Sequence, residues 1–225
     1  MNTPDTFDVI YNFVSGPLVW AAFILFIGGS IYRLWKMLSL VNKKDRYIFT
    51  YMSLYHSLRS IAHWILPFGT TSWRMHPAMT VATFAFHICL IILPIFLVGH
   101  VVMIAFSWGV SWPTLPAGVA NVMTVIVIAC CIFFLVRRIV QKDVKYLTTP
   151  SDYVLLLITA APFITGFFAY HQWLDYRTCI LLHILSGEIM LAAIPFTRLS
   201  HMLFAVFTRS YIASEFGGVR CAKDW

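Results

Sequence analysis

Long stretches without a charged residue are the feature of this chain that most restricts its fold. Residues 75–136 contain no Asp, Glu, Lys or Arg, and neither do residues 9–32 or 153–174, while residues 178–197 carry only Glu188. A helix needs about 20 apolar residues to cross the hydrocarbon core of a bilayer, so the stretch 75–136 is long enough for two spans and a turn. The sequence therefore predicts an all-α integral membrane protein with five transmembrane helices, at about residues 15–36, 78–106, 117–137, 152–170 and 178–206.

The composition agrees with a membrane location. Of the 225 residues, 60% are hydrophobic and 11% are charged, whereas soluble domains average about 25% charged residues. We expect one transmembrane domain over residues 1–225, with an amphipathic segment at 44–66 that lies in the interface or docks a partner, and a polar tail at 207–225. No second domain and no sequence repeat is predicted.

The distribution of the cations predicts the orientation. With five spans, all 16 lysines and arginines except Arg177 fall on one side of the membrane. Cytoplasmic loops carry an excess of Lys and Arg, so we expect the amino terminus outside and the carboxyl terminus inside. The formal charge of +7 is then a consequence of topology, and nucleic acid is not an expected partner.

Four of the eight histidines lie within predicted spans at matching depths. His183 and His201 are 18 residues apart, which on an ideal helix places them on one face with a separation of about 27 Å. The second span is expected to run from the inside to the outside and the fifth from the outside to the inside, so His87 matches His201 in depth and His100 matches His183. Two histidines at each of two depths suit two b-type haems, and ionisable groups within spans are candidates for function. No C-x-x-C motif is present for covalent haem attachment.

The spacing of His87 and His100 is less favourable, because 13 residues place them about 140° apart around an ideal helix. Pro94 lies between them and is expected to kink or rewind the helix. The alternative pair is His76 with His87, about 20° from a common face, although His76 lies at the inner boundary, a shallow position for a haem ligand.

Four further residues are candidates for a quinone or proton site. These are Gly99 beside His100, His171 and Asp175 at the outer surface, and Glu188, an acid inside the fifth predicted span. No nucleophile–base set or pair of carboxylates indicates a catalytic centre, so any enzyme activity is expected from partner subunits.

Three segments resemble the respiratory nitrate reductase gamma subunit family, the quinol-oxidising cytochromes b. Residues 86–87 and 98–100 resemble its second helix, and residues 182–183 with 195–201 resemble its fifth helix, including the 18-residue spacing. Residues 135–138 and 148–152 resemble the loop between its third and fourth helices.

The resemblance implies two b haems, with His87 and His201 on the inner iron and His100 and His183 on the outer iron. It also implies an electron-transfer subunit of the bacterial inner membrane. Electrons would pass between menaquinol and an iron–sulfur partner on the cytoplasmic face.

The chain departs from nitrate reductases in two respects. The two histidines of its second helix, His87 and His100, are farther apart in the sequence, and residues 75–136 contain no lysine to match the one at the quinol site of nitrate reductases. It is closer to the cytochrome b subunits of anaerobes. Such subunits are linked to heterodisulfide-reductase-like or ferredoxin-like proteins, or assemble with periplasmic multihaem cytochromes c in sulfate reducers. The alternatives are a haem conduit without a quinone site and a haem-free membrane anchor.

Overall fold

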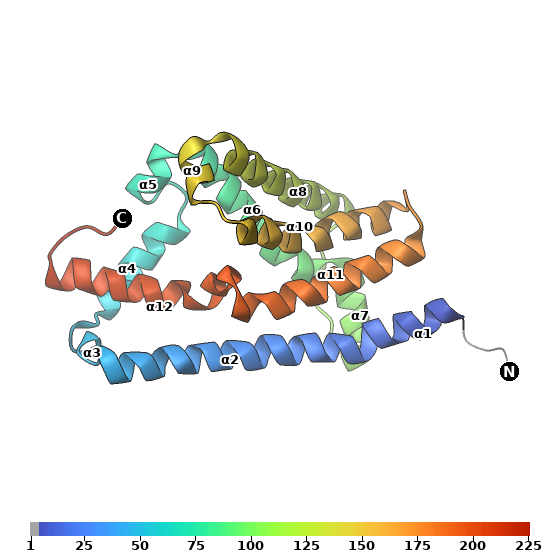
Figure 1. Cartoon of the computed structure of the whole chain (residues 1–225), viewed down its shortest axis with the longest axis horizontal. Helices are drawn as coiled ribbons and strands as arrows, with labels where there is room; N and C mark the ends of the chain where they lie inside the picture. Colours follow the sequence, from blue (N-terminus) through green and yellow to red (C-terminus); the bar gives the residue numbers. More distant parts are fainter. Residues whose placement is uncertain (1–4) are drawn as a thin grey trace. The chain divides into compact units, whose positions relative to one another are not determined.

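The computed structural model describes residues 5–225, and within that range no residue lies in a strand (Figure 1). The helices are α1 (Thr6–Phe13), η1 (Val14–Leu18), α2 (Val19–Lys44), α3 (Ile48–Tyr51), α4 (Leu54–Ile65), α5 (Thr71–Met75), α6 (Pro77–Phe96), α7 (Val98–Trp108), α8 (Ala117–Val140), α9 (Lys142–Leu147), α10 (Pro150–His171), α11 (Tyr176–Phe196), η2 (Arg198–Ser200), α12 (His201–Ala213) and η3 (Ser214–Val219). The prediction of an all-α fold is confirmed.

Five helical segments of the described chain are long and apolar enough to cross a membrane, and they match the five predicted spans in order. They are Thr6–Lys44, Pro77–Trp108, Ala117–Val140, Pro150–His171 and Tyr176–Phe196. The first segment is longer than predicted at both ends, because α1, η1 and α2 follow one another without an interruption.

The fifth span ends earlier than predicted, and a continuous helix over 178–206 is wrong. Helix α11 ends at Phe196, and Thr197 has an extended backbone with φ −124° and ψ −171°. The Thr197 hydroxyl accepts a hydrogen bond from the amide of Leu199 at 3.2 Å, so it caps a new helical start. Pro195 precedes this point and donates no amide hydrogen bond. The interruption therefore has a local cause.

The chain divides into two compact units, whereas the sequence predicts a single domain. One unit comprises Met1–Thr80 with Glu188–Trp225, and the other comprises Val81–Gly187. Helices α6 and α11 contribute to both units, since each boundary falls inside one of them.

The unit Val81–Gly187 is built on the packing of α8 against α10, which lie side by side in Figure 1. Val127 is completely buried, and Phe86 contacts Phe134 edge to face with ring centroids 5.4 Å apart. The thiols of this core belong to Cys89, Cys130 and Cys131. Free cysteine acts as a small apolar side chain at such positions.

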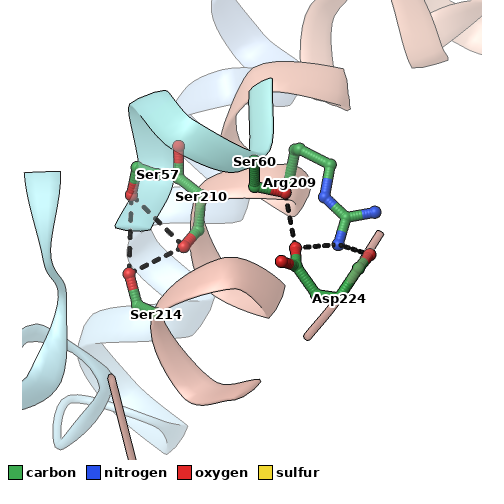
Figure 2. Close-up of polar contacts among 6 residues, drawn as sticks. All are labelled: Ser57, Ser60, Arg209, Ser210, Ser214 and Asp224. Carbon is green, nitrogen blue, oxygen red and sulfur yellow. Dashed lines mark hydrogen bonds and ion pairs between the residues drawn. The ribbon is translucent and has the colours of Figure 1, made fainter. Parts of the chain in front are cut away.

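In the other unit, α4 packs against α12 through a seam of serines (Figure 2). The Ser57 hydroxyl lies 3.4 Å from that of Ser214 and donates to the Ser210 carbonyl. The Ser214 hydroxyl also accepts from the Ser53 amide at 3.0 Å. Small hydroxyl side chains let two helices approach closely while they satisfy each other's hydrogen bonds.

The last residues of the chain lie against the same two helices (Figure 2). The Asp224 carboxylate accepts hydrogen bonds from the Ser60 hydroxyl and, at 2.6 Å, from the Arg209 guanidinium. The Trp225 ring stacks on the His63 ring with centroids 4.5 Å apart. The predicted polar tail 207–225 is therefore helical as far as Val219 and then packs on α4. We call Ser60, His63, Arg209, Asp224 and Trp225 the tail clamp.

Replacement of Asp224 by alanine is expected to destabilise this unit. The Asp224 side chain is 2% exposed and that of Arg209 is 14% exposed, so the variant leaves a largely buried cation without its partner. Breaking such a pair costs about 3 kcal/mol. Thermal unfolding in detergent, followed by circular dichroism, measures the loss.

Arg220→Ala is the matched control, because it removes an ion pair with Glu215 in which the arginine is 59% exposed. Exposed pairs contribute little to stability, so a much smaller shift is expected. Equal shifts for the two variants would contradict a stabilising role of the tail clamp.

Candidate functional site

The four histidines predicted as ligands share one local arrangement. In each, Nδ1 lies within hydrogen-bond distance of a backbone carbonyl oxygen: His87 with Thr83 (2.8 Å), His100 with Pro94 (2.8 Å), His183 with Pro162 (2.9 Å) and His201 with Arg198 (2.9 Å). A carbonyl oxygen only accepts, so Nδ1 donates and carries the proton. The lone pair of the neutral ring is then on Nε2. Metal-binding histidines characteristically donate their second ring N–H to a carbonyl or carboxylate in this way.

Two of these histidines, His100 and His183, are brought together within the unit Val81–Gly187. Their ring centroids are 5.9 Å apart and their planes differ by 20°. Two imidazoles on opposite sides of one metal ion have centroids about 6 Å apart, because each metal–nitrogen bond is about 2 Å long. The predicted proximity of these residues is therefore present in the structure.

An interruption between α6 and α7 positions His100. Leu97 leaves the helical conformation with φ −69° and ψ 130°, three residues after Pro94. The last carbonyls of a helix have no intrahelical partner, and that of Pro94 accepts from His100 Nδ1. The helix is interrupted between His87 and His100, as expected; Pro94 itself lies inside α6, and the break lies three residues later, at Leu97.

A glycine of α10 makes room for the His183 ring. A Cβ atom on Gly166 would lie 2.9 Å from both Cε1 and Nδ1 of His183, closer than side-chain atoms normally approach. The ring thereby reaches across to α10 and donates to the Pro162 carbonyl. Gly166 and Pro162 are not among the site residues predicted from the sequence. An isolated glycine within an otherwise uninterrupted apolar span was the available signal.

His87 and His201 have well-defined local positions in different compact units. His87 lies in α6, and its ring meets that of Phe86 edge to face at 5.2 Å. His201 is the first residue of α12, directly after the turn η2. Because the helix is interrupted at Thr197, the ideal-helix spacing from His183 to His201 does not describe this segment. Their pairing at one iron stays a prediction.

His76, the alternative ligand, lies at the start of the second span. It is the exposed residue between α5 and α6, and its carbonyl accepts from both the hydroxyl and the amide of Thr80. Its backbone thus forms part of the cap of α6, in agreement with the shallow position expected for it.

His171 is enclosed by aromatic rings at the end of α10. Its centroid lies 4.3 Å from that of Phe167 and 5.0 Å from that of Trp173. Its Nε2 lies 2.9 Å from the Asn121 side-chain oxygen of α8. Asn121 was not identified from the sequence, where an asparagine near the end of a span gives no specific signal.

Asp175 caps the amino terminus of α11. It accepts from the Thr178 amide at 2.8 Å and from the Thr178 hydroxyl at 2.7 Å. The Thr178 hydroxyl is the main cause of a lowered Asp175 pKa, with the amide next. A carboxyl group with a lowered pKa is a weak proton acceptor near neutral pH, so the geometry favours a structural role.

Glu188 and Gly99 complete the predicted set. Glu188 is 7% exposed, and neither carboxylate oxygen has a hydrogen-bond partner among the described residues. Gly99 has open space around the position of a Cβ atom. Glu188 belongs to one compact unit, whereas Gly99, His171 and Asp175 belong to the other.

Clusters of three or more metal-binding side chains do not occur in the part of the chain that the structure describes. An iron at His100 and His183 would therefore have two protein ligands. This number fits a haem, whose porphyrin nitrogens supply the four remaining ligands, and it does not fit a tetrahedral zinc site.

Five helical segments of the described chain that are long and apolar enough to cross a membrane define a multi-pass α-helical membrane protein. The chain is 39% identical over 211 residues to a protein of Nitratidesulfovibrio vulgaris (strain Hildenborough) whose name is given as "Protein", with 92% of this chain and 93% of that protein covered. The chain belongs to the same family. No family model matches it, and no solved structure shows a significant match.

The capping role of Asp175 predicts a pH dependence. Its folded-state pKa is lower than that of the unfolded chain, near 3.9. Its contribution is therefore complete above that value and is lost as the pH falls through the folded-state pKa. Hydrogen exchange should show that the protection factor of the Thr178 amide falls over this acidic range.

Two variants distinguish the effect of the Asp175 charge from the effect of its capping hydrogen bonds. Asp175→Asn keeps a good N-cap residue and should retain protection with little dependence on pH, whereas Asp175→Ala should lose protection at every pH. Unchanged protection in Asp175→Ala would exclude the capping role.

Proposed function

We propose that this protein is the dihaem cytochrome b subunit of an anaerobic respiratory complex in the bacterial inner membrane. It passes electrons between menaquinol or menaquinone and an iron–sulfur partner on the cytoplasmic face. The observation that carries the proposal is the pair His100–His183, two imidazoles 5.9 Å apart with both Nδ1 atoms directed to carbonyl oxygens.

The outer site would be formed by His100 and His183. When bound there, haem b supplies one-electron redox chemistry. The protein holds each imidazole in the tautomer whose Nε2 binds iron, through the carbonyls of Pro94 and Pro162. Both rings are constrained before any ligand binds, which reduces the ordering cost of binding.

The inner site would be formed by His87 and His201. The support is the Nδ1–carbonyl contact that each residue makes within its own segment, together with the resemblance to nitrate reductase gamma subunits. Apolar side chains around α6 keep the dielectric constant low, and burial is one of the factors that set a haem potential.

The proposed orientation has the amino terminus outside and the carboxyl terminus inside, as the bias of the cations predicts. The partner on the cytoplasmic face would be a heterodisulfide-reductase-like or ferredoxin-like iron–sulfur protein. A periplasmic multihaem cytochrome c is the proposed partner on the outer side. A menaquinone site near the outer haem remains part of the proposal, with His171 and Glu188 as candidates to exchange protons.

Haem content is the first measurement, by pyridine haemochrome on the purified chain. We expect about two b haems per chain. A content of zero after haem-supplied expression would overturn the proposal and leave a haem-free membrane anchor.

Substitution of Gly166 by alanine is expected to lower the outer-haem content. The added methyl group would occupy space 2.9 Å from the His183 ring, and the ring would have to leave the Pro162 carbonyl. The haem content should drop from about two to about one per chain. Gly187→Ala on the same helix as His183 meets nothing within 4 Å, so it should retain both haems.

His201→Ala should remove the inner haem selectively. The remaining haem should keep the spectrum and the midpoint potential of the outer site, measured by redox titration. Retention of two haems in this variant would show that His201 is not a ligand.

A further inference from the structure

Helix α4 has its polar face directed toward the protein. Ser57 and Ser60 are 5% and 0% exposed and contact α12 and the tail. On the same side, the Arg59 guanidinium lies 4.4 Å from the centroid of Trp225 and 5.4 Å from that of Tyr55. The serine hydroxyls and the guanidinium of α4, which in a surface helix would be hydrated, are therefore in contact with other protein groups.

The opposite face of α4 is apolar and exposed. Leu54, Leu58 and Ile65 are 75%, 57% and 66% exposed, and an ideal helix places them within about 40° of one another. A surface helix in water has the reverse arrangement, with its apolar stripe toward the core. This face is therefore suited to apolar surroundings.

The position of α4 in the chain indicates which apolar medium covers it. The helix lies between two spans, Thr6–Lys44 and Pro77–Trp108. Exposed apolar residues continue along the chain from the first span toward α4: Trp35, Leu38, Phe49 and Leu54. Exposed apolar side chains thus recur along the chain from the first candidate span to α4.

Charge and length agree with a location at the membrane interface. Lys43, Lys44 and Arg46 directly precede this region, and basic residues next to a span attract anionic headgroups. Twelve helical residues extend about 18 Å, too short to cross a hydrocarbon core of about 30 Å.

We propose that α4 is embedded in one leaflet of the bilayer, with Leu54, Leu58 and Ile65 in contact with lipid acyl chains. Its serine face and the tail clamp then form a polar layer between α4 and α12 that lipid protects from water. This surface goes beyond the proposed electron transfer and does not depend on haem.

The test uses the full chain in vesicles of phosphatidylethanolamine and phosphatidylglycerol. Cys221 is the exposed thiol of the described chain, and the other four cysteines are buried, so Cys221→Ser provides the background. Single Leu58→Cys and Ile65→Cys variants are labelled with the polarity-sensitive fluorophore NBD. Asp143→Cys on α9, an exposed polar position, is the matched control.

Quenching by a doxyl-labelled phospholipid should exceed quenching by aqueous iodide at least about twofold at positions 58 and 65, and the reverse should hold at 143. Stronger iodide quenching at 58 and 65 would place this face in water and overturn the proposal. Protection from both quenchers would mean that a protein surface covers it, and would also overturn it.

A labelled variant is compared with the background chain by far-ultraviolet circular dichroism, so that only helical, inserted protein is interpreted. Leu54→Cys provides a third position on the same face if either variant is misfolded.

Discussion

Backbone amide and carbonyl groups in hydrocarbon have no water to bind, so they must bond within the protein. Continuous helices meet this requirement, but each interruption releases carbonyl oxygens. At the break near Leu97, the carbonyl of Pro94 accepts from His100, and at the turn after Phe196 the carbonyl of Arg198 accepts from His201. Two predicted ligands are therefore oriented by backbone groups that helix interruptions make available, and the same bonds determine which ring nitrogen carries the lone pair.

The same constraint explains the distribution of polar side chains. Ser57 of α4 bonds to Ser214 of η3 and to the Ser210 carbonyl of α12, and Asp224 is paired with Arg209 and Ser60. Leu54, Leu58 and Ile65 of α4 remain on the outside. A water-soluble helical pair would have the opposite arrangement. Glu188 differs, because it is buried without a hydrogen-bond partner among the described residues. Such a group is costly at this depth, which keeps it as a candidate for proton exchange.

The spans were predictable because each depends on local composition. A long apolar stretch with few or no charged residues has few alternatives to a membrane-spanning helix, and each of the five predicted stretches contains a helix long and apolar enough to cross a membrane. Hydropathy did not place the end of the fifth span correctly, because apolar residues resume at Met202 after the short polar segment 197–201. Pro195 followed by Thr197 was the available signal, but proline within a membrane helix is compatible with either a kink or an end.

In the candidate site, too, some features were predictable from the sequence and others were not. The histidines themselves were evident from the sequence, since ionisable side chains within apolar spans are few. Gly166 and Asn121 were not, because their importance depends on which residues of a neighbouring helix face them. The docking of Asp224 and Trp225 on α4 likewise joins segments about 160 residues apart in the chain.

The sequence by itself determined the class of protein, the number and order of the spans, and the four histidines that are candidates for ligands. Charge and hydropathy suffice for these features, because the free energy of transferring a residue from water to lipid depends mainly on that residue itself. Only the tertiary structure decided that His100 and His183 lie together, that Gly166 admits the ring, and that the polar face of α4 is turned inward. Those outcomes depend on contacts between helices, and a contact between helices is not specified by the composition of either helix alone.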